Sequence, residues 1–220
     1  MVDLKKLLVK EVNKQKLSYN QLKELYRTVR KECDLDPPEK SKKLYELPTQ
    51  EELNAFYKNT IPKHRLIFKT LEGTGLRVSE LCKLKVKDID FQNNTAFVKE
   101  GKGKKDRIII LGNRLKELLM LFLTGKKNKY LFETNRNTKY SVRRIEQLQK
   151  YYKELAGITK KFTVHTFRHI YFTRLAENKI SKEMRALLAG HSNEKMQDVY
   201  SHCGVGGIKK EVIDIVDKIL

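Results

Sequence analysis

The spacing of hydrophobic positions predicts two short helices at the start of the chain. Leucine and valine recur at helical intervals over residues 3–16, and leucine, tyrosine and valine do so over residues 18–33. Lysine and arginine occupy many of the remaining positions, so both helices are expected to be basic and amphipathic. The stretch DLDPPEKSKK (34–43) then interrupts the pattern with two prolines and several charges, which is typical of a linker.

A second unit begins after this linker. Thr49 and Glu52 have the spacing of a capping box at a helix start, and Pro62 suits the first turn of the following helix. That helix is expected to end at Gly73 or Gly75, because glycine readily takes the left-handed backbone conformation found at helix ends.

From residue 85 the pattern changes to that of strands. Three short runs have β-type composition: VKDIDF (86–91), TAFVKE (95–100) and RIIIL (107–111). Helical spacing then resumes over residues 113–123, 140–156, 164–177, 181–189, 193–200 and 207–219. The predicted fold class is therefore α+β, mostly helical with one small antiparallel β-meander. We expect a short helical segment with its linker over residues 1–44 and a larger domain over residues 45–220.

The charge balance narrows the choice of partner. Forty-seven lysines and arginines oppose 27 aspartates and glutamates, which gives a net charge of +20. Such an excess favours a polyanion, nucleic acid before an anionic membrane, although a generally lysine-rich surface would give the same balance. No apolar run approaches the ~20 residues that cross a bilayer, and the charged N-terminus is unlike a secretory signal. We therefore expect a cytoplasmic protein without a membrane partner.

Four stretches carry residues suited to chemistry: GTGLRVSEL (73–81), EGKGKKDRIII (100–110), HTFRH (165–169) and LLAGHSNEKMQDVYSHC (187–203). Each is ambiguous alone. Arg77 and Glu80 also suit a surface ion pair, and the lysine-rich turn lacks the spacing of a nucleotide-binding loop. His165 and His169 have a zinc-ligand spacing, but Thr166 stands where a zinc protease has glutamate. The histidine and tyrosine of the fourth stretch suit ordinary packing equally well.

Taken together and in this order, the stretches resemble the active site of the tyrosine recombinases, the phage integrase family. The motifs TGLRVSEL, GKGKKDR, HTFRH and LAGHS are all present, and Tyr200 follows the last of them at the family's spacing. The resemblance covers about residue 46 to the C-terminus. It implies the tyrosine-recombinase catalytic fold and a site-specific recombinase that cleaves and rejoins DNA through a 3′-phosphotyrosyl intermediate.

The resemblance implies six catalytic residues: Arg77, Lys102, His165, Arg168, His191 and Tyr200. Tyr200 is the expected nucleophile, and the forked guanidinium groups of Arg77 and Arg168 are expected to hold the phosphate oxygens. Lys102 is the expected general acid toward the leaving oxygen, and His165 is expected to assist proton transfer at the tyrosine. Tyr171 is the next tyrosine to consider as nucleophile.

Other residues are expected to assist this set. His191 would bond a phosphate oxygen, Glu80 would orient Arg77, and His169 would be a buried support. The residues expected to contact DNA are Lys104, Lys105 and Arg107, and either of these two lysines remains an alternative general acid. The resemblance implies no metal or other cofactor.

The expected partners are double-stranded DNA and further copies of the chain, as a tetramer on DNA, with accessory DNA-bending proteins as a possible addition. The tail SHCGVGGIKKEVIDIVDKIL (201–220) carries a hydrophobic stripe after several glycines. By resemblance this C-terminal exchange helix would cross to a neighbouring protomer, and docking on its own subunit is the alternative. Two other functions stay open: a DNA-binding regulator without turnover, and relaxation of DNA of the type IB topoisomerase kind. The resemblance also implies a larger N-terminal helical domain, and we expect the segment 1–44 to stand in its place in this sequence.

Overall fold

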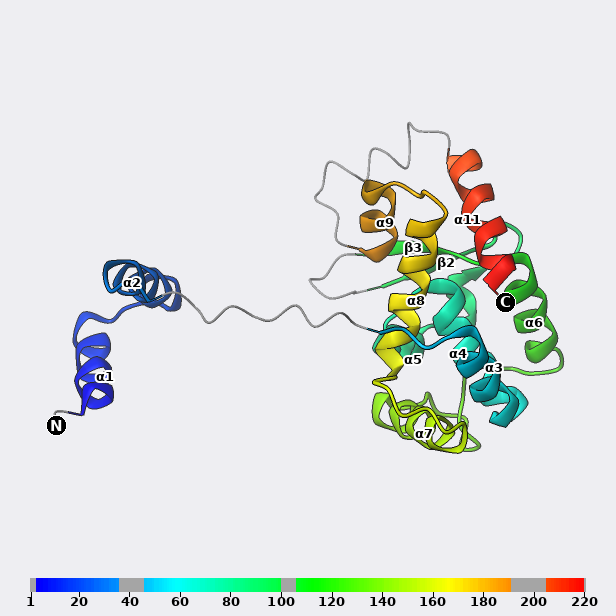
Figure 1. Cartoon of the computed structure of the whole chain (residues 1–220), viewed down its shortest axis with the longest axis horizontal. Coiled ribbons are helices and arrows are strands. Elements are labelled where there is room, and N and C mark those ends of the chain that lie inside the picture. The colour runs from blue at the N-terminus through cyan, green and yellow to red at the C-terminus, as the bar shows by residue number, and fades with distance from the viewer. Residues whose placement is uncertain (1–2, 36–45, 100–105, 191–204, 220) are drawn as a thin grey trace. The chain divides into compact units, whose positions relative to one another are not determined.

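The computed structural model describes residues 3–35, 46–99, 106–190 and 205–219 of the 220-residue chain (Figure 1). The chain divides into two compact units, Met1–Tyr45 and Glu46–Leu220. No helix in the described part of the chain is long and apolar enough to cross a membrane.

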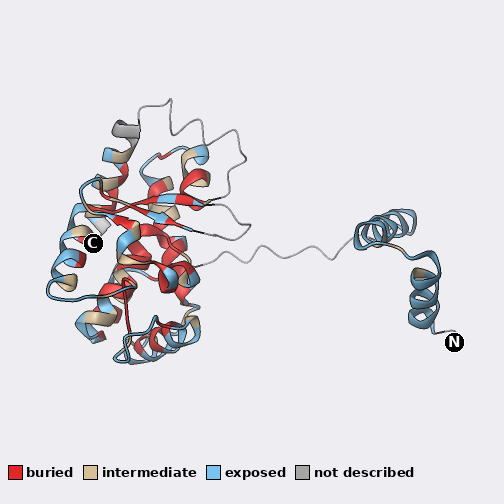
Figure 2. Ribbon diagram, turned by 180° about the vertical axis from the view of Figure 1, so that it is seen from behind, coloured by how far each residue is buried: buried red, intermediate tan, exposed pale blue. Residues whose placement is uncertain are grey.

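The N-terminal unit contains two capped helices, α1 (Leu4–Gln15) and α2 (Tyr19–Glu32). Helix α2 begins with a capping box, in which the Gln21 N–H donates to the Ser18 hydroxyl and the Ser18 N–H donates to the Gln21 side chain. Neither helix buries a residue, and Figure 2 shows both of them largely in the colour of exposed residues. Capping and sequence pattern thus determine these helices, which have no hydrophobic core of their own.

The larger unit begins with two helices, α3 (Gln50–Asn59) and α4 (Pro62–Thr74). The capping box of Thr49 and Glu52 and the early position of Pro62 are as the sequence predicts. Of the two glycines considered, Gly75 ends α4, with φ +62° in the left-handed region. The same turn sends the chain into α5 (Val78–Lys83).

The three strands form one antiparallel sheet in the order β1–β2–β3. They are β1 (Ile89–Asp90), β2 (Thr95–Val98) and β3 (Arg107–Ile110), and Val98 pairs with Arg107. The strand predicted over 86–91 is too long, because its first part is a short 3₁₀ helix, η1 (Val86–Asp88). The Asp88 N–H donates to the Lys85 carbonyl within this turn, so it takes no part in a ladder.

The remaining helices of the described chain match the predicted helical runs closely. They are α6 (Asn113–Leu123), α7 (Val142–Leu155), α8 (Val164–Glu177), α9 (Lys182–Ala189) and α11 (Val205–Ile219). The helix predicted over residues 193–200 lies outside the described residues. The α+β class, mostly helical with a small antiparallel meander, is confirmed.

Helix α8 lies between two hydrophobic clusters. On one side Phe167 stacks on Phe68 of α4, with ring centroids 5.5 Å apart, and both belong to the main core. On the other side Tyr171 and Leu175 join a second cluster with residues of β3, α9 and α11. The buried residues of both clusters run through the centre of the larger unit in Figure 2. Burial on both sides fixes α8, so its N-terminal turn is a firm support for side chains.

Helix α11 docks on its own unit in this single chain. It contacts α4, α6, α8 and β3, and its Val212 and Val216 side chains are fully buried. Asp217 accepts hydrogen bonds at the start of α6, from the Arg114 N–H and the Asn113 side chain, both at 3.0 Å. A side chain at Gly112 would meet the Asp217 carboxylate at 2.5 Å, so this approach requires glycine.

Candidate active site

Glu80 joins two arginines at the start of α5. The Arg77 backbone N–H donates to Glu80 Oε2 at 2.7 Å, and Arg77 Nη1 donates to Glu80 Oε1 at 2.8 Å. Arg107, the first residue of β3, donates from Nη1 and Nη2 to the same two oxygens, each at 2.7 Å. Glu80 therefore contacts Arg77 directly, and its role in orienting Arg77 stays a prediction.

These three residues differ in exposure, which separates their roles. The side chains of Glu80 and Arg107 are each 4% exposed, whereas that of Arg77 is 21% exposed. Arg107 was expected to contact DNA, but the structure buries it and commits its guanidinium group to Glu80. The sequence placed it beside a lysine-rich turn, and nothing in that pattern indicated that the side chain points inward.

Arg168 is buried on the first part of α8 and bridges two turns of the chain. Its Nη1 donates to the Gly75 carbonyl, and its Nη2 donates to the Ala189 carbonyl at 2.9 Å. Gly75 closely precedes Arg77, and Ala189 closely precedes His191 in sequence. Its guanidinium carbon also lies 4.8 Å from the centre of the Phe172 ring. Arg168 therefore holds together two of the segments that carry expected catalytic residues.

The charges of this site act on one another. Burial, and then the positive charges of Arg77 and Arg107, lower the pKa of Arg168 to about 10. Burial alone would raise the pKa of Glu80, but the hydrogen bonds and charge of Arg107, and then the contacts with Arg77, hold it down at about 2. Glu80 and Arg168 are thus both charged near neutral pH. The stabilisation from ionised Glu80 is complete above its ordinary pKa and is lost as the pH falls toward about 2.

The two histidines of HTFRH lie side by side at the start of α8. Their ring centroids are 4.7 Å apart, and the rings are perpendicular. Partial burial lowers the pKa of His165, and the charges of His169, Arg168 and Arg77 lower it further. The expectation that His169 is a buried support is wrong as to burial, because His169 is exposed. A residue four positions from His165 shares its face of the helix, and here that face is turned outward.

Tyr171 is placed for packing and not for attack on a substrate. Its side chain is 1% exposed, and a Cβ at Gly75 would lie 2.5 Å from the tyrosine ring. The close approach of α4 and α8 at this point therefore depends on glycine and excludes DNA from the ring.

The structure brings together Arg77, Glu80, Arg107, His165 and Arg168. The other expected site residues lie outside the described residues: Lys102, Lys104, Lys105, His191 and Tyr200.

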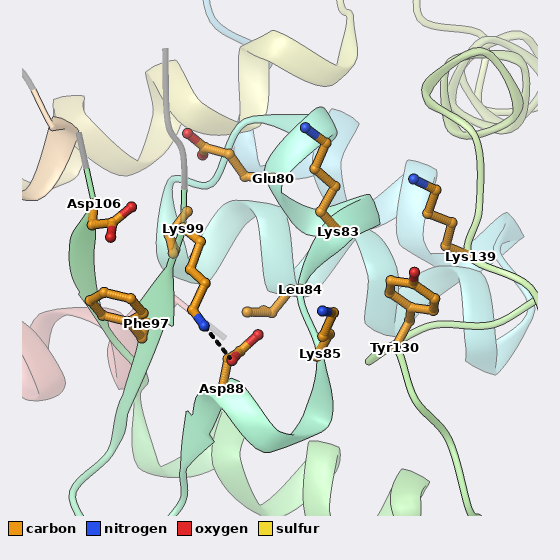
Figure 3. A pocket seen from close by; sticks show the side chains of 11 residues that line it. Glu80, Lys83, Leu84, Lys85, Asp88, Phe97, Lys99, Asp106, Tyr130 and Lys139 are labelled. Carbon is orange, nitrogen blue, oxygen red and sulfur yellow. Dashed lines mark ion pairs between the residues drawn. The ribbon is translucent and has the colours of Figure 1, made fainter. Parts of the chain in front are cut away.

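A pocket of about 500 Å³ adjoins Glu80 and contains lysines that sequence reasoning did not single out (Figure 3). Lys83, on α5, and Lys139, beside Tyr130, point the same way in this view. Lys99 is paired with Asp88 at 4.0 Å. The alternation of Lys83 and Lys85 was visible in the sequence, but Lys139 comes from a distant loop that only the fold brings near.

The fold and the site define a mostly helical domain in which two arginines, Arg77 and Arg168, are suited to binding a phosphate group. Residues 47–204 match the model of the phage integrase family. The chain belongs to the phage integrase family. It is 35% identical over 184 residues to the tyrosine recombinase XerA of Thermococcus onnurineus, a match that covers 80% of this chain and 64% of that relative.

Solved structures show the same fold. The crystal structure of a XerA recombinase superposes with a TM-score of 0.61 at 26% identity, and the match covers 94% of this chain and 80% of that one. A λ integrase tetramer bound to a Holliday junction gives a TM-score of 0.61 at 21% identity, covering 80% of this chain and 57% of that one.

Proposed function

We propose that this protein cleaves and rejoins DNA strands at specific sites through a covalent phosphotyrosyl intermediate. The observation that carries the proposal is the convergence of Arg77 and Arg168 at one site, where the charge of Arg77 acts on buried Arg168. Two guanidinium groups held by the fold suit the non-bridging oxygens of a phosphodiester. Family membership supports the same chemistry.

The arginines would supply electrostatic stabilisation of the transition state. Each guanidinium group has five N–H donors, so Arg168 keeps donors for a phosphate while it holds the Gly75 and Ala189 carbonyls. Arg77 is partly exposed and is aligned by Glu80 before the substrate arrives. Donors that are already in place stabilise the transition state most strongly where negative charge develops in it.

Tyr200 is the proposed nucleophile. Its phenolic oxygen would bond to the phosphorus as the bond to the 5′-oxygen breaks, which leaves the strand joined to the tyrosine as a 3′ ester. The proton of the phenol would pass toward His165, and Lys102 would give a proton to the departing 5′-oxygen. Attack by a 5′-hydroxyl would reverse each transfer, so no energy source is required. Lys104 and Lys105 remain alternatives to Lys102, and His191 would bond a phosphate oxygen.

The arginines would take the electrostatic role that a divalent ion has in other phosphoryl-transfer sites. We therefore expect strand cleavage to survive saturating chelator. Restoration of a chelated, inactive protein by zinc or magnesium would contradict this expectation.

DNA is the proposed partner, and the pocket lysines would extend the contact beyond the scissile phosphate. Lys83 and Lys139 are exposed and point to the side at which Glu80 lies (Figure 3). Phosphate contacts by such lysines would add affinity without sequence specificity.

Assembly on DNA is proposed from the fold's relatives. The solved λ integrase is a tetramer on a Holliday junction, and we propose a tetramer for this chain as well. Helix α11 would then leave its own unit and occupy the same surface of a neighbour. The hydrophobic contacts of Val212 and Val216 and the cap from Asp217 define the surface that it would use. Accessory DNA-bending proteins remain a possible addition.

A nicked suicide substrate tests the proposed function against its two alternatives. The short fragment beyond the cleavage site diffuses away, so a strand-cleaving enzyme remains covalently attached and resists denaturing electrophoresis. A mobility shift without an adduct would instead indicate a DNA-binding regulator. An adduct together with relaxation of supercoiled plasmids lacking any specific site would indicate the topoisomerase-like activity.

A further inference from the structure

Arg107 is the most constrained polar side chain of the site. Both of its terminal nitrogens are committed to Glu80, and its side chain is 4% exposed. Its Nε atom is buried and has no hydrogen-bond partner among the residues that the structure describes. A buried donor without a partner costs stability, so stability alone does not account for an arginine at this position.

The first consequence of Arg107 concerns the charge of Arg77. Glu80 carries one negative charge and accepts four hydrogen bonds, two from Arg77 and two from Arg107. With Arg77 alone, the carboxylate would neutralise the guanidinium group that must attract the phosphate. Because Arg107 offsets the charge of Glu80, the carboxylate orients Arg77 while the positive charge of Arg77 stays available.

The second consequence concerns the turn that precedes His191. Gly190 has φ +71°, and a Cβ built there would lie 3.0 Å from Cδ of Arg107. The stem of Arg107 thus packs directly against this turn. Arg107 is also the residue at which β3 begins, just after the lysine-rich turn. One side chain therefore contacts Glu80, which holds Arg77, and the turn before His191. In the sequence it follows Lys102 by five positions.

We propose that Arg107 is a positioning residue for strand cleavage, which holds Glu80 so that Arg77 is oriented but not neutralised, and which sets the turn before His191. This inference rests on the proposed function. It replaces the expectation that Arg107 contacts DNA directly. Arg107 acts through Glu80 and Gly190 and does not touch the substrate.

The test compares R107M, R107K and R174M by single-turnover adduct formation on the nicked substrate and by DNA affinity. R107M keeps the length of the stem and removes the charge and the donors. A misplacement of about 1 Å at a reacting group costs on the order of 10²-fold in rate, so we expect R107M to form adduct about 10²-fold more slowly with DNA affinity little changed. R107K restores the charge but not the fork, and we expect a partial recovery of the rate.

R174M is the matched control for loss of a buried ion pair. Arg174 lies on α8 and, like Arg107, pairs with a buried glutamate, in this case Glu72 at 2.9 Å. Both R107M and R174M are expected to lower the melting temperature, but only R107M is expected to slow cleavage. The split between adduct rate and DNA affinity gives a further readout, because a purely structural role would not slow cleavage at unchanged affinity.

Three outcomes would overturn the proposal. They are a wild-type adduct rate in R107M, a loss of DNA affinity that accounts for its slower rate, and an equal slowing in R174M. If R107M does not fold, R107K decides: slower cleavage at unchanged affinity supports positioning, and a wild-type rate contradicts it. Failure of the proposed function is distinguishable, because the unmodified protein itself would then form no adduct.

Discussion

At the scale of single residues, the site depends on arginines whose positions are set before any substrate binds. Arg168 is buried because its donors satisfy main-chain carbonyls at two turns, Gly75 and Ala189. Arg77 is partly exposed, and its guanidinium group donates to the buried carboxylate of Glu80. The motifs identified these residues from the sequence. The sequence could not show that Arg107 points inward or that His169 is exposed, because both depend on which face a neighbouring element covers.

Arg168→Lys tests whether the fork of the guanidinium group matters beyond its charge. An ammonium group cannot bridge two carbonyls and a phosphate in fixed geometry. Loss of one preorganised donor costs about 10²–10³ in rate, and we expect a loss of that order in adduct formation. Single-turnover kinetics with saturating protein measure it. A lysine variant as fast as the wild type would show that charge alone suffices.

The pH dependence of cleavage tests the role of His165. Partial burial and the neighbouring positive charges hold the pKa of His165 below its ordinary value of about 6.5, so the ring is neutral at pH 7 and can accept a proton. The rate should therefore stay high at neutral pH and fall only as the pH drops through a value below about 6.5. His165→Gln should lower the rate and remove this inflection. An inflection that persists in the variant would assign it to another group.

At the scale of elements, local signals predicted the helices well and the short strand poorly. The capping box at Thr49, the proline at position 62 and the hydrophobic spacing set helix bounds that the structure reproduces closely. The strand expected over 86–91 was predicted too long. Its composition is β-like, but the first backbone groups form hydrogen bonds within the turn of η1. For α11, the sequence showed only a hydrophobic stripe on the predicted helix. It could not show which surface the stripe packs against, because that surface is formed by elements far away in the sequence.

Asp217→Ala tests the contact that fastens α11 to α6. Gly112 precedes α6 without a side-chain cap of its own, and Asp217 supplies one from another helix. Loss of a helix N-cap costs about 1 kcal/mol, and we expect a decrease of this size in the free energy of unfolding. Urea denaturation measures the decrease, and hydrogen exchange over 205–219 should rise with it. An unchanged stability would mean that Val212 and Val216 alone retain the helix.

At the scale of the whole molecule, the net charge of +20 and the grouping of lysines beside the site favour binding to a polyanion. The sequence predicted this partner from composition and motif order. It did not predict the pocket beside Glu80, because Lys83 and Lys139 are far apart in the chain and line one pocket only through the fold. Charge composition therefore favours a class of partner, and the fold favours a surface for it.

The salt dependence of DNA affinity tests the proposed pocket contacts. Each phosphate contact contributes about 1 to the slope of log affinity against log salt, so Lys83→Gln with Lys139→Gln should reduce the slope by about 2. Lys210→Gln with Lys218→Gln makes the same change of net charge at exposed positions of α11. An equal reduction in both double variants would attribute the effect to net charge rather than to the pocket.

The central claim is that Tyr200 attacks a DNA phosphate that Arg77 and Arg168 hold. The most direct measurement is covalent trapping on the nicked suicide substrate, followed by mass spectrometry of the peptide that carries the nucleotide, for the wild type, Tyr200→Phe and Tyr171→Phe. We predict an adduct on the peptide containing Tyr200, complete loss of adduct in Tyr200→Phe with DNA binding retained, and an adduct in every Tyr171→Phe preparation that folds. An adduct that persists in Tyr200→Phe, or one mapped to any other residue, would contradict the account.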